Sequence, residues 1–200
     1  MLNNAQRNKL NFLTSKIQEC QKCVNLCQNG MAVPYWTEYS KYMIIAESPG
    51  RNEVRKNART PLIGKAGRLL FRFLARKKIS LKREDFLILN TVQCRPVVAN
   101  NKNGKPSKKE SRNCRFWVEK YIEVFEPKII LAFGNYALSY FVDNNLGITR
   151  ESGSVYDLPN GVKLIPCIHP ASLLYGDFHK DLLIESLIIF RNEIDKIKEK

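Results

Sequence analysis

Four short apolar runs, separated by longer stretches with helical patterning, constrain the fold of this chain most strongly. Their length and β-branched content predict buried strands at 42–46, 86–90, 129–133 and 164–168. Helices are expected at 4–19, 64–77, 107–125, 135–142 and 181–198. Strands that alternate with helices form parallel sheets covered on both faces. The pattern therefore predicts an α/β fold of three layers, α/β/α, with a central four-stranded parallel sheet.

Polar or conformationally special residues follow each predicted strand, namely Glu47, Asn90, Gly134 and His169. In open parallel sheets the ligand binds beyond the carboxyl ends of the strands. We therefore expect the functional site at this edge of the sheet. No linker or change of composition divides the chain, so residues 1–200 are expected to form one domain.

The charge of the chain points to a polyanionic partner. The chain has 200 residues, with 33 Lys and Arg against 19 Asp and Glu, for a formal net charge of +14. Such a balance is typical of proteins that bind nucleic acid or an acidic membrane surface. The longest uncharged apolar stretch, 129–142, is too short to span a bilayer, and the N-terminus has no apolar signal core. We expect a cytoplasmic, nucleoid-associated monomer with no membrane partner.

Basic residues gather on one helix and one loop. On the predicted helix 64–77 they form a stripe opposite the apolar face, and further cations occupy the Gly/Pro/Asn-rich loop 95–106 and the start of the next helix. These positions are expected to hold DNA phosphates, although basic helix faces are often simply solvated. They are Lys65, Arg68, Arg72, Arg76, Arg95, Lys102, Lys105, Lys108 and Lys109.

Six cysteines in a reducing compartment are more often metal ligands or buried thiols than disulfides. Cys20 and Cys23 form a C-x2-C pair, and Cys94 and Cys114 flank the basic loop. Four thiolates can hold zinc or a 4Fe-4S cluster, and free buried thiols remain an alternative. Cys27 could replace one ligand, whereas Cys167 lies in the fourth apolar run and is expected in the core. A metal centre would tie the N-terminal segment to the loop after the second strand.

Four motifs, in order, are similar to those of the family 4 (iron–sulfur) uracil-DNA glycosylases, over about residues 20–187. Ala-Glu-Ser-Pro-Gly at 46–50 resembles the family's Gly-Glu-Gly/Ala-Pro-Gly, and Pro-Leu-Ile-Gly-Lys-Ala-Gly-Arg-Leu-Leu at 61–70 resembles Pro-Phe-Val-Gly-x-Ala-Gly-x-Leu-Leu. The run at 89–97 resembles Thr-Asn-x-Val-Lys-Cys-Arg-Pro-Pro, and the run at 169–175 resembles His-Pro-Ala/Ser-x-Leu-Leu-Arg. The resemblance implies a DNA-repair hydrolase that removes uracil from single- or double-stranded DNA and leaves an abasic site. It also implies a 4Fe-4S cluster held by Cys20, Cys23, Cys94 and Cys114.

The resemblance assigns chemistry to the residues at the carboxyl edge. His169 is expected to donate a hydrogen bond to O2 of the departing uracil, and Glu47 to position or activate water. Glu47 could instead hold the backbone N–H groups of its own turn. The amide of Asn90 carries a donor and an acceptor, which suits the O4 and N3–H edge of uracil and mismatches cytosine.

Further contacts are expected around a base flipped out of the duplex. The backbone at Ser48 and Gly50 is expected to touch the base, and Leu62 occupies the position of the family's stacking phenylalanine. Leu173 and Leu174 could fill the gap left by the flipped nucleotide or could belong to the core.

Several departures from the family pattern keep other functions open. Leu62 offers no aromatic face, Tyr175 replaces the final arginine, and Ala46 and Ser48 replace small residues of the first motif. A glycosylase with altered base choice, such as hypoxanthine or xanthine, is one alternative. A non-catalytic DNA-binding module is another, although Glu47, Asn90 and His169 argue against it. A redox or radical centre on Cys20, Cys23 and Cys27 is a weaker alternative.

Overall fold

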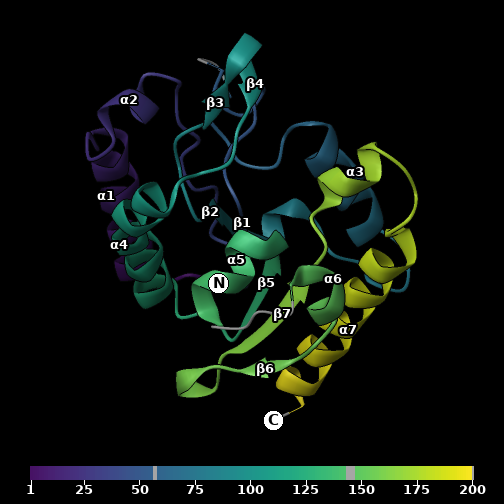
Figure 1. Ribbon diagram of the computed structural model, residues 1–200. Helices are drawn as coiled ribbons and strands as arrows, with labels where there is room; N and C mark the ends of the chain where they lie inside the picture. The colour runs from purple at the N-terminus through teal and green to yellow at the C-terminus, as the bar shows by residue number, and fades with distance from the viewer. Residues whose placement is uncertain (56–57, 143–146, 200) are drawn as a thin grey trace.

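The computed structural model describes residues 1–55, 58–142 and 147–199. Its main sheet has the strand order β2-β1-β5-β7-β6 (Figure 1). The strands are β1 (Tyr42–Ala46), β2 (Phe86–Asn90), β5 (Ile129–Phe133), β7 (Lys163–Cys167) and β6 (Tyr156–Asp157). β1, β2, β5 and β7 are parallel, which confirms the predicted α/β fold and its four strands.

The fifth strand, β6, corrects the expected strand count. It pairs antiparallel with β7 at the edge of the sheet and has two residues. A strand this short carries no readable alternation of apolar and polar residues, so the sequence gives no signal for it.

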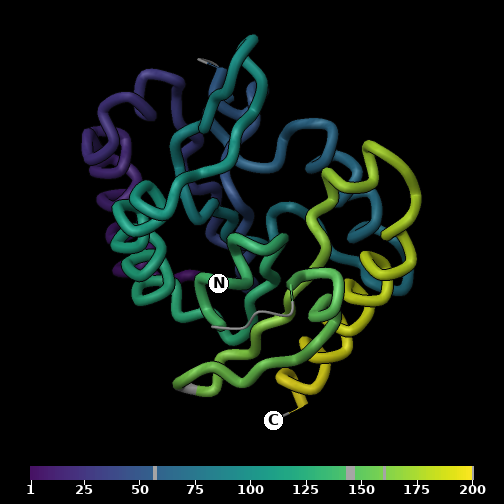
Figure 2. The backbone as a smooth tube through the Cα atoms, viewed as in Figure 1, coloured from purple at the N-terminus to yellow at the C-terminus, as the bar shows by residue number. Residues whose placement is uncertain are grey.

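The helices cover the two faces of the sheet (Figures 1 and 2). One face carries α1 (Asn4–Gln18), α4 (Lys108–Phe125) and α5 (Gly134–Phe141), and the other carries α3 (Lys65–Leu74) and α7 (Lys180–Lys198). Successive strand residues point to opposite sides, so Met43 and Ile45 join the core on the α1–α4 side. Ile44 and Ala46 join the core on the α3–α7 side. This double burial explains why each strand reads as a continuous apolar run.

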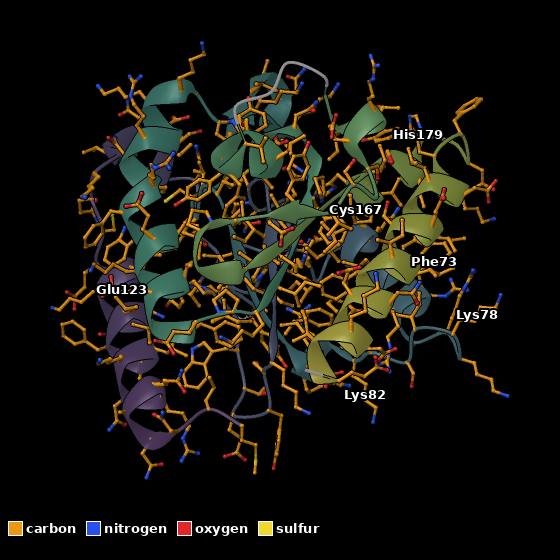
Figure 3. All side chains as sticks on the ribbon, turned by 90° about the horizontal axis from the view of Figure 1, so that it is seen from below. Phe73, Lys78, Lys82, Glu123, Cys167 and His179 are labelled. Atoms are coloured by element: carbon orange, nitrogen blue, oxygen red, sulfur yellow. The ribbon has the colours of Figure 1, made fainter. Side chains whose placement is uncertain are left out.

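The predicted helices exist, with shifts at their ends. α4 begins behind the predicted capping box, in which Ser107 and Glu110 bond each other's backbone N–H groups. α3 ends at Leu74, three residues before the predicted end at Lys77. Figure 3 shows Lys78 and Lys82 at the surface beyond α3, whereas Phe73 and Cys167 lie inside. Burial of Cys167 agrees with the core thiol expected there.

Several shorter elements lie outside the main sheet and its covering helices. α2 (Val24–Cys27) and α6 (Ile148–Glu151) are single turns that were not predicted. The loop 95–106 contains a two-stranded hairpin, β3 (Val97–Val98) and β4 (Lys102–Asn103), which stands at the top of Figure 1. Within the described residues, no helix combines the length and apolarity that crossing a membrane requires.

Candidate active site

The parallel strands bring four of the predicted residues to one edge. Ala46 pairs with Asn90 across β1 and β2, and Phe133 pairs with Cys167 across β5 and β7. Glu47, Asn90, Gly134 and His169 therefore occur at the ends of neighbouring strands. This agrees with the edge chosen from the sequence.

The local structure fixes the tautomer of His169. Its Nδ1 accepts a hydrogen bond from the backbone N–H of Ala171 at 3.1 Å, at the start of the 3-10 helix η4 (Pro170–Leu174). An acceptor nitrogen carries no proton, so Nε2 carries the proton of the neutral ring and is a donor. The ring also meets Phe133 edge-on, with centroids 6.2 Å apart.

Burial lowers the pKa of His169 to about 4, so the imidazole is neutral at physiological pH. Gly134 has a φ of +82°, and a Cβ there would lie 3.5 Å from the Cβ of His169. A glycine thus meets two demands at this position, the left-handed backbone and the close approach to His169. The result is a neutral donor packed against the end of β5.

The low pKa of His169 predicts how stability depends on pH. The folded state favours the neutral ring, so its contribution is complete above pH 6.5 and is lost as the pH falls toward about 4. The melting temperature of the unaltered protein should therefore fall relative to that of His169→Gln between pH 7 and pH 4.5. An equal change of melting temperature in the two proteins across this range would contradict a histidine that stays neutral in the folded state.

Asn90 is almost fully buried, and its Nδ2 has no hydrogen-bond partner within the described residues. Its main-chain carbonyl accepts a short hydrogen bond from Gln93 Nε2, so the backbone is held while the side-chain donor stays unused. Buried polar groups without a partner are rare in proteins, and they often mark a site where a ligand completes the pairing. The amide predicted to read a base is therefore left with a vacant donor.

Glu47 is held through its backbone. Its carbonyl accepts hydrogen bonds from Thr91 Oγ1 at 2.7 Å and from the N–H of Val92 at 3.1 Å. Burial raises the pKa of the Glu47 carboxyl, and the positive charge of Lys105 opposes this rise. Among the described residues, no hydrogen bond reaches the Glu47 carboxylate. The alternative that this carboxylate holds its own turn is not supported, because Glu53 binds the turn instead.

The expected base contacts sit in two adjoining segments. The N–H of Gly50 donates to Glu53 Oε2 at 3.0 Å, and a Cβ on Gly50 would lie 3.2 Å from Asn103 Nδ2 of the hairpin. Ser48 is partly exposed. Leu62 is 4% exposed and has a φ of +54°, a left-handed conformation that is costly for leucine. Leucine at this position packs into the core on the α3 side rather than standing free.

The predicted DNA-contacting residues lie in three different settings. Lys65, Arg68 and Arg72 are exposed on α3. Leu174 is 45% exposed, whereas Leu173 is partly buried against the α3–α7 core. A cleft of about 310 Å³ joins these elements and is lined by Leu69, Arg72, Phe73, Arg76, Leu173, Asp177 and Lys180. Of the two leucines, Leu174 is the one available as a wedge.

Arg95 has intramolecular partners instead of a free guanidinium. It is 4% exposed, and it donates to Asn103 Oδ1 at 2.8 Å and to Asn101 Oδ1 and O at 2.7 and 2.8 Å. These bonds close the β3–β4 hairpin over the turn at Gly50. The position of Arg95 therefore favours a role in holding the hairpin rather than a direct phosphate contact.

Five cysteines from three parts of the chain lie together beside the α1–α4 core: Cys20, Cys23, Cys27, Cys94 and Cys114. Cys27 Sγ lies 3.6 Å from Cys94 Sγ, and Cys23 Sγ accepts a hydrogen bond from Asn113 Nδ2 at 3.2 Å. Burial raises the pKa of the Cys114 thiol to about 11, and the neighbouring cysteines add to this. In residues 1–55, 58–142 and 147–199, no group of His, Cys, Asp or Glu side chains is arranged to hold a single metal ion.

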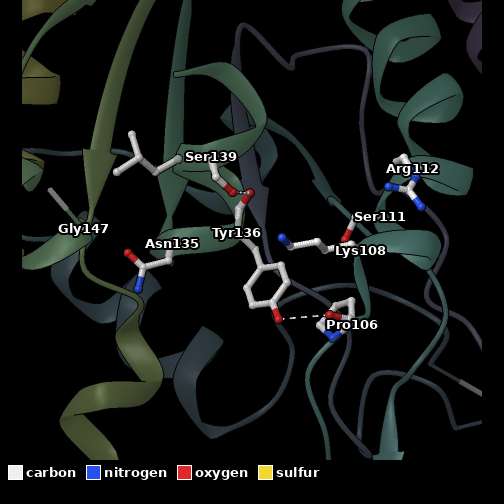
Figure 4. Close-up of a pocket in the computed structure, with 9 residues that line it drawn as sticks. Pro106, Lys108, Ser111, Arg112, Asn135, Tyr136, Ser139 and Gly147 are labelled. Carbon is white, nitrogen blue, oxygen red and sulfur yellow. Dashed lines mark hydrogen bonds between the residues drawn. The ribbon is translucent and has the colours of Figure 1, made fainter. Parts of the chain in front are cut away.

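A pocket of about 640 Å³ adjoins the site between α4 and α5 (Figure 4). Lys108, Ser111 and Arg112 contribute from α4, and Asn135, Tyr136 and Ser139 from α5. The Tyr136 hydroxyl donates to the carbonyl of Pro106 at 3.0 Å. Burial raises the pKa of this tyrosine, and the negative charges of Glu47 and Glu110 add to the rise. Tyr136 was not predicted, because an aromatic residue within an apolar helical segment is ordinarily part of the core.

Comparison with known proteins agrees with this arrangement. Residues 34–188 match the model of the uracil DNA glycosylase superfamily. The chain is 33% identical over 167 residues to the type-4 uracil-DNA glycosylase of Thermotoga maritima, covering 82% of this chain and 83% of that protein. It is 34% identical over 175 residues to that of Saccharolobus solfataricus, covering 84% and 78%. The chain belongs to the uracil-DNA glycosylase superfamily.

Proposed function

We propose that this protein excises uracil from DNA as a monofunctional glycosylase, by hydrolysis of the N-glycosidic bond. One observation carries the proposal. Within the described residues, two donors at the same edge of the sheet have no hydrogen-bond partner, the Nε2–H of the neutral His169 and the Nδ2–H of the buried Asn90. Relatives named type-4 uracil-DNA glycosylase support the choice of base.

Asn90 would read the base after it leaves the duplex. A base inside the helix cannot be reached, so the nucleotide must rotate into the site. The unused Nδ2–H of Asn90 would donate to uracil O4, and its Oδ1 would accept from N3–H. Cytosine presents a donor and an acceptor in the opposite order, so it would leave both groups of Asn90 mispaired. Backbone contacts at Ser48 and Gly50 and the side chain of Leu62 would complete the base site.

His169 and Glu47 would act on the two products of bond cleavage. As the bond breaks, negative charge grows on the base and positive charge on the sugar. The Nε2–H of His169 would stabilise the charge at uracil O2, and a neutral donor does this without a competing proton transfer. The Glu47 carboxylate would stabilise the sugar cation and orient the attacking water.

The test is single-turnover excision on oligonucleotides that carry one lesion each, as single strands and as duplexes. The proposal expects release of uracil and an alkali-labile abasic site. Leu62 lacks an aromatic face to stack on the base, so a glycosylase of altered base choice is the alternative. Preferential release of hypoxanthine or xanthine would favour it. Tight DNA binding without release of any base would replace the proposal with a binding module.

The exposed cations of α3 should dominate the salt dependence of DNA binding. Replacing Arg68 and Arg72 by alanine is expected to weaken binding on every sequence and to flatten the slope of log K against log salt by about one unit per lost contact. Fluorescence anisotropy at several salt concentrations measures this slope.

Lys41→Ala combined with Lys128→Ala is the matched control for the α3 variant. Lys41 and Lys128 are exposed and precede β1 and β5, so they lie at the amino edge of the sheet, away from the site. The control should leave the slope unchanged. If the slope of log K against log salt is the same for the α3 variant and the unaltered protein, α3 does not contact DNA phosphates.

The five neighbouring cysteines support a 4Fe-4S cluster held by Cys20, Cys23, Cys94 and Cys114. Such a cluster binds each thiolate through a different iron, so the sulfurs need not converge on one point as they do around zinc. When bound, the cluster would supply a covalent tie between α1, the end of β2 and α4. Cys27 Sγ lies close enough to Cys94 Sγ for Cys27 to compete with one of the four cysteines as a ligand of the cluster.

A further inference from the structure

Glu53 is a buried carboxylate that the proposed chemistry does not use. It is 8% exposed, and its two oxygens face two different segments of the chain. Oε2 accepts from the N–H of Gly50 at 3.0 Å, and Oε1 accepts from the N–H of Gly64 at 3.5 Å. Gly50 ends the turn that carries Glu47, and Gly64 follows the segment that carries Leu62. One side chain therefore joins the two segments expected to enclose the base.

Arg83 also secures the second segment, through its carbonyl groups. It lies in the 3-10 helix η1 (Arg83–Asp85), immediately before β2. Its guanidinium donates to the carbonyls of Pro61 and Leu62 at 2.6 and 3.1 Å. The same group stacks over the rings of Tyr35 and Phe71, 4.3 and 5.1 Å from their centroids. These contacts fix the planar guanidinium of Arg83 in one orientation, and the single ammonium group of a lysine could not make the same set of contacts.

The segment held by these residues is under conformational strain. Leu62 has a φ of +54°, and strained residues persist only where the surroundings over-determine them. A Cβ added at Gly67 would lie 1.8 Å from the carbonyl oxygen of Leu62, so α3 approaches this carbonyl as closely as glycine permits. Arg83 binds the same oxygen. Three independent contacts thus determine the path of residues 61–64.

We propose that Glu53 and Arg83 are positioning residues that set the spacing between the turn 47–50 and the segment 61–64, and thereby the width of the base site. The inference rests on the proposed function. Neither side chain needs to touch the base, because each acts through backbone groups of the neighbouring segments. Burial raises the pKa of Glu53, while the N–H groups of Gly50, Gly64 and Leu62 and the charge of Arg83 favour its ionised form. The carboxylate is the form that can accept from two segments at once.

This arrangement predicts a defect in base affinity that is separate from DNA binding. Glu53→Gln keeps the shape of the side chain, but its amide NH2 must face one of the two backbone N–H groups. Removing one charge-assisted contact is expected to weaken the inhibition of excision by free uracil roughly tenfold to a hundredfold. Affinity for undamaged DNA should stay unchanged, since phosphate contacts lie elsewhere. Arg83→Lys should shift the uracil inhibition constant in the same direction.

Glu193→Gln is the matched control, because Glu193 is an equally buried carboxylate on α7 that pairs with Lys196. It should lower the melting temperature without changing the inhibition constant for uracil. Amide hydrogen exchange adds a second readout, in which Gly50 and Gly64 lose protection in Glu53→Gln and keep it in the control. Rescue by Glu53→Asp is expected to be partial, because the shorter side chain reaches only one of the two N–H groups.

The outcomes separate this inference from the proposed function. If the unaltered protein excises uracil and both Glu53→Gln and Arg83→Lys leave the uracil inhibition constant unchanged, the positioning role is wrong and the function stands. A protein that neither binds nor excises uracil overturns both. A loss of melting temperature alone, equal to that of Glu193→Gln, would reduce Glu53 to a stabilising residue.

Discussion

His169→Ala should slow uracil excision roughly a hundredfold to a thousandfold, the usual loss when one donor to a developing anion is removed. The backbone N–H of Ala171 occupies Nδ1, so the whole contribution comes from the Nε2–H that alanine lacks. Affinity for uracil-containing DNA should change little, because this interaction strengthens as the bond breaks. Single-turnover excision together with a binding titration on the same duplex separates the two effects.

His179→Ala is the control for this experiment, since His179 lies at the start of α7, outside the predicted site. It should excise uracil at the unaltered rate. An equal loss of rate and of DNA affinity in His169→Ala would contradict transition-state stabilisation and point to ground-state binding instead. If the excision rate of His169→Ala falls less than threefold, another residue donates the hydrogen bond to the leaving uracil.

Cys94→Ser should abolish the brown colour and visible absorbance expected of the anaerobically purified protein, and should also lower the melting temperature sharply. Cys94 is buried, pairs with Met31 through a backbone bridge, and lies among the four other cysteines. Because metal binding is also folding free energy, the loss of the cluster should loosen the N-terminal segment. Iron and sulfide analysis, absorbance and thermal melting measure the effect.

Cys27→Ser provides the comparison for this variant, and it is expected to retain the cluster. Cys27 Sγ lies 3.6 Å from Cys94 Sγ, so Cys27 is the cysteine best placed to replace a ligand. A cluster that survives without Cys27 leaves Cys20, Cys23, Cys94 and Cys114 as the four ligands. Loss of iron in Cys27→Ser would overturn the proposed ligand set. A colourless unaltered protein with one zinc per chain would overturn the iron assignment.

The sequence predicted the elements that have a strong local signal. The four parallel strands are apolar along their whole length because both faces of the sheet are covered, and α4 has a complete capping box at Ser107. β6 and the β3–β4 hairpin were missed because strands of two residues depend on pairing partners rather than on their own pattern. The edge that carries Glu47, Asn90 and His169 was predicted because strand ends in a parallel sheet coincide.

The supporting residues of the site could not be predicted in the same way. Glu53 and Arg83 look like ordinary polar residues in sequence, and their importance comes from backbone groups that only the fold brings near them, at Gly64 for Glu53 and at Leu62 for Arg83. Arg95, in contrast, was predicted to contact phosphate, because a basic residue in a basic loop suggests such a contact. Its partners Asn101 and Asn103 become visible only once the hairpin is formed.

The short run from Asn90 to Cys94 makes one part of this chain intolerant of insertions. Gln93 donates from its side chain to the Asn90 carbonyl, and its own carbonyl accepts from the backbone N–H of Ala32. One added residue here would turn Asn90 or Cys94 to the wrong side. The hairpin between Cys94 and Cys114 has no such restriction, so related chains should vary in length there while keeping the spacing from Asn90 to Cys94 constant.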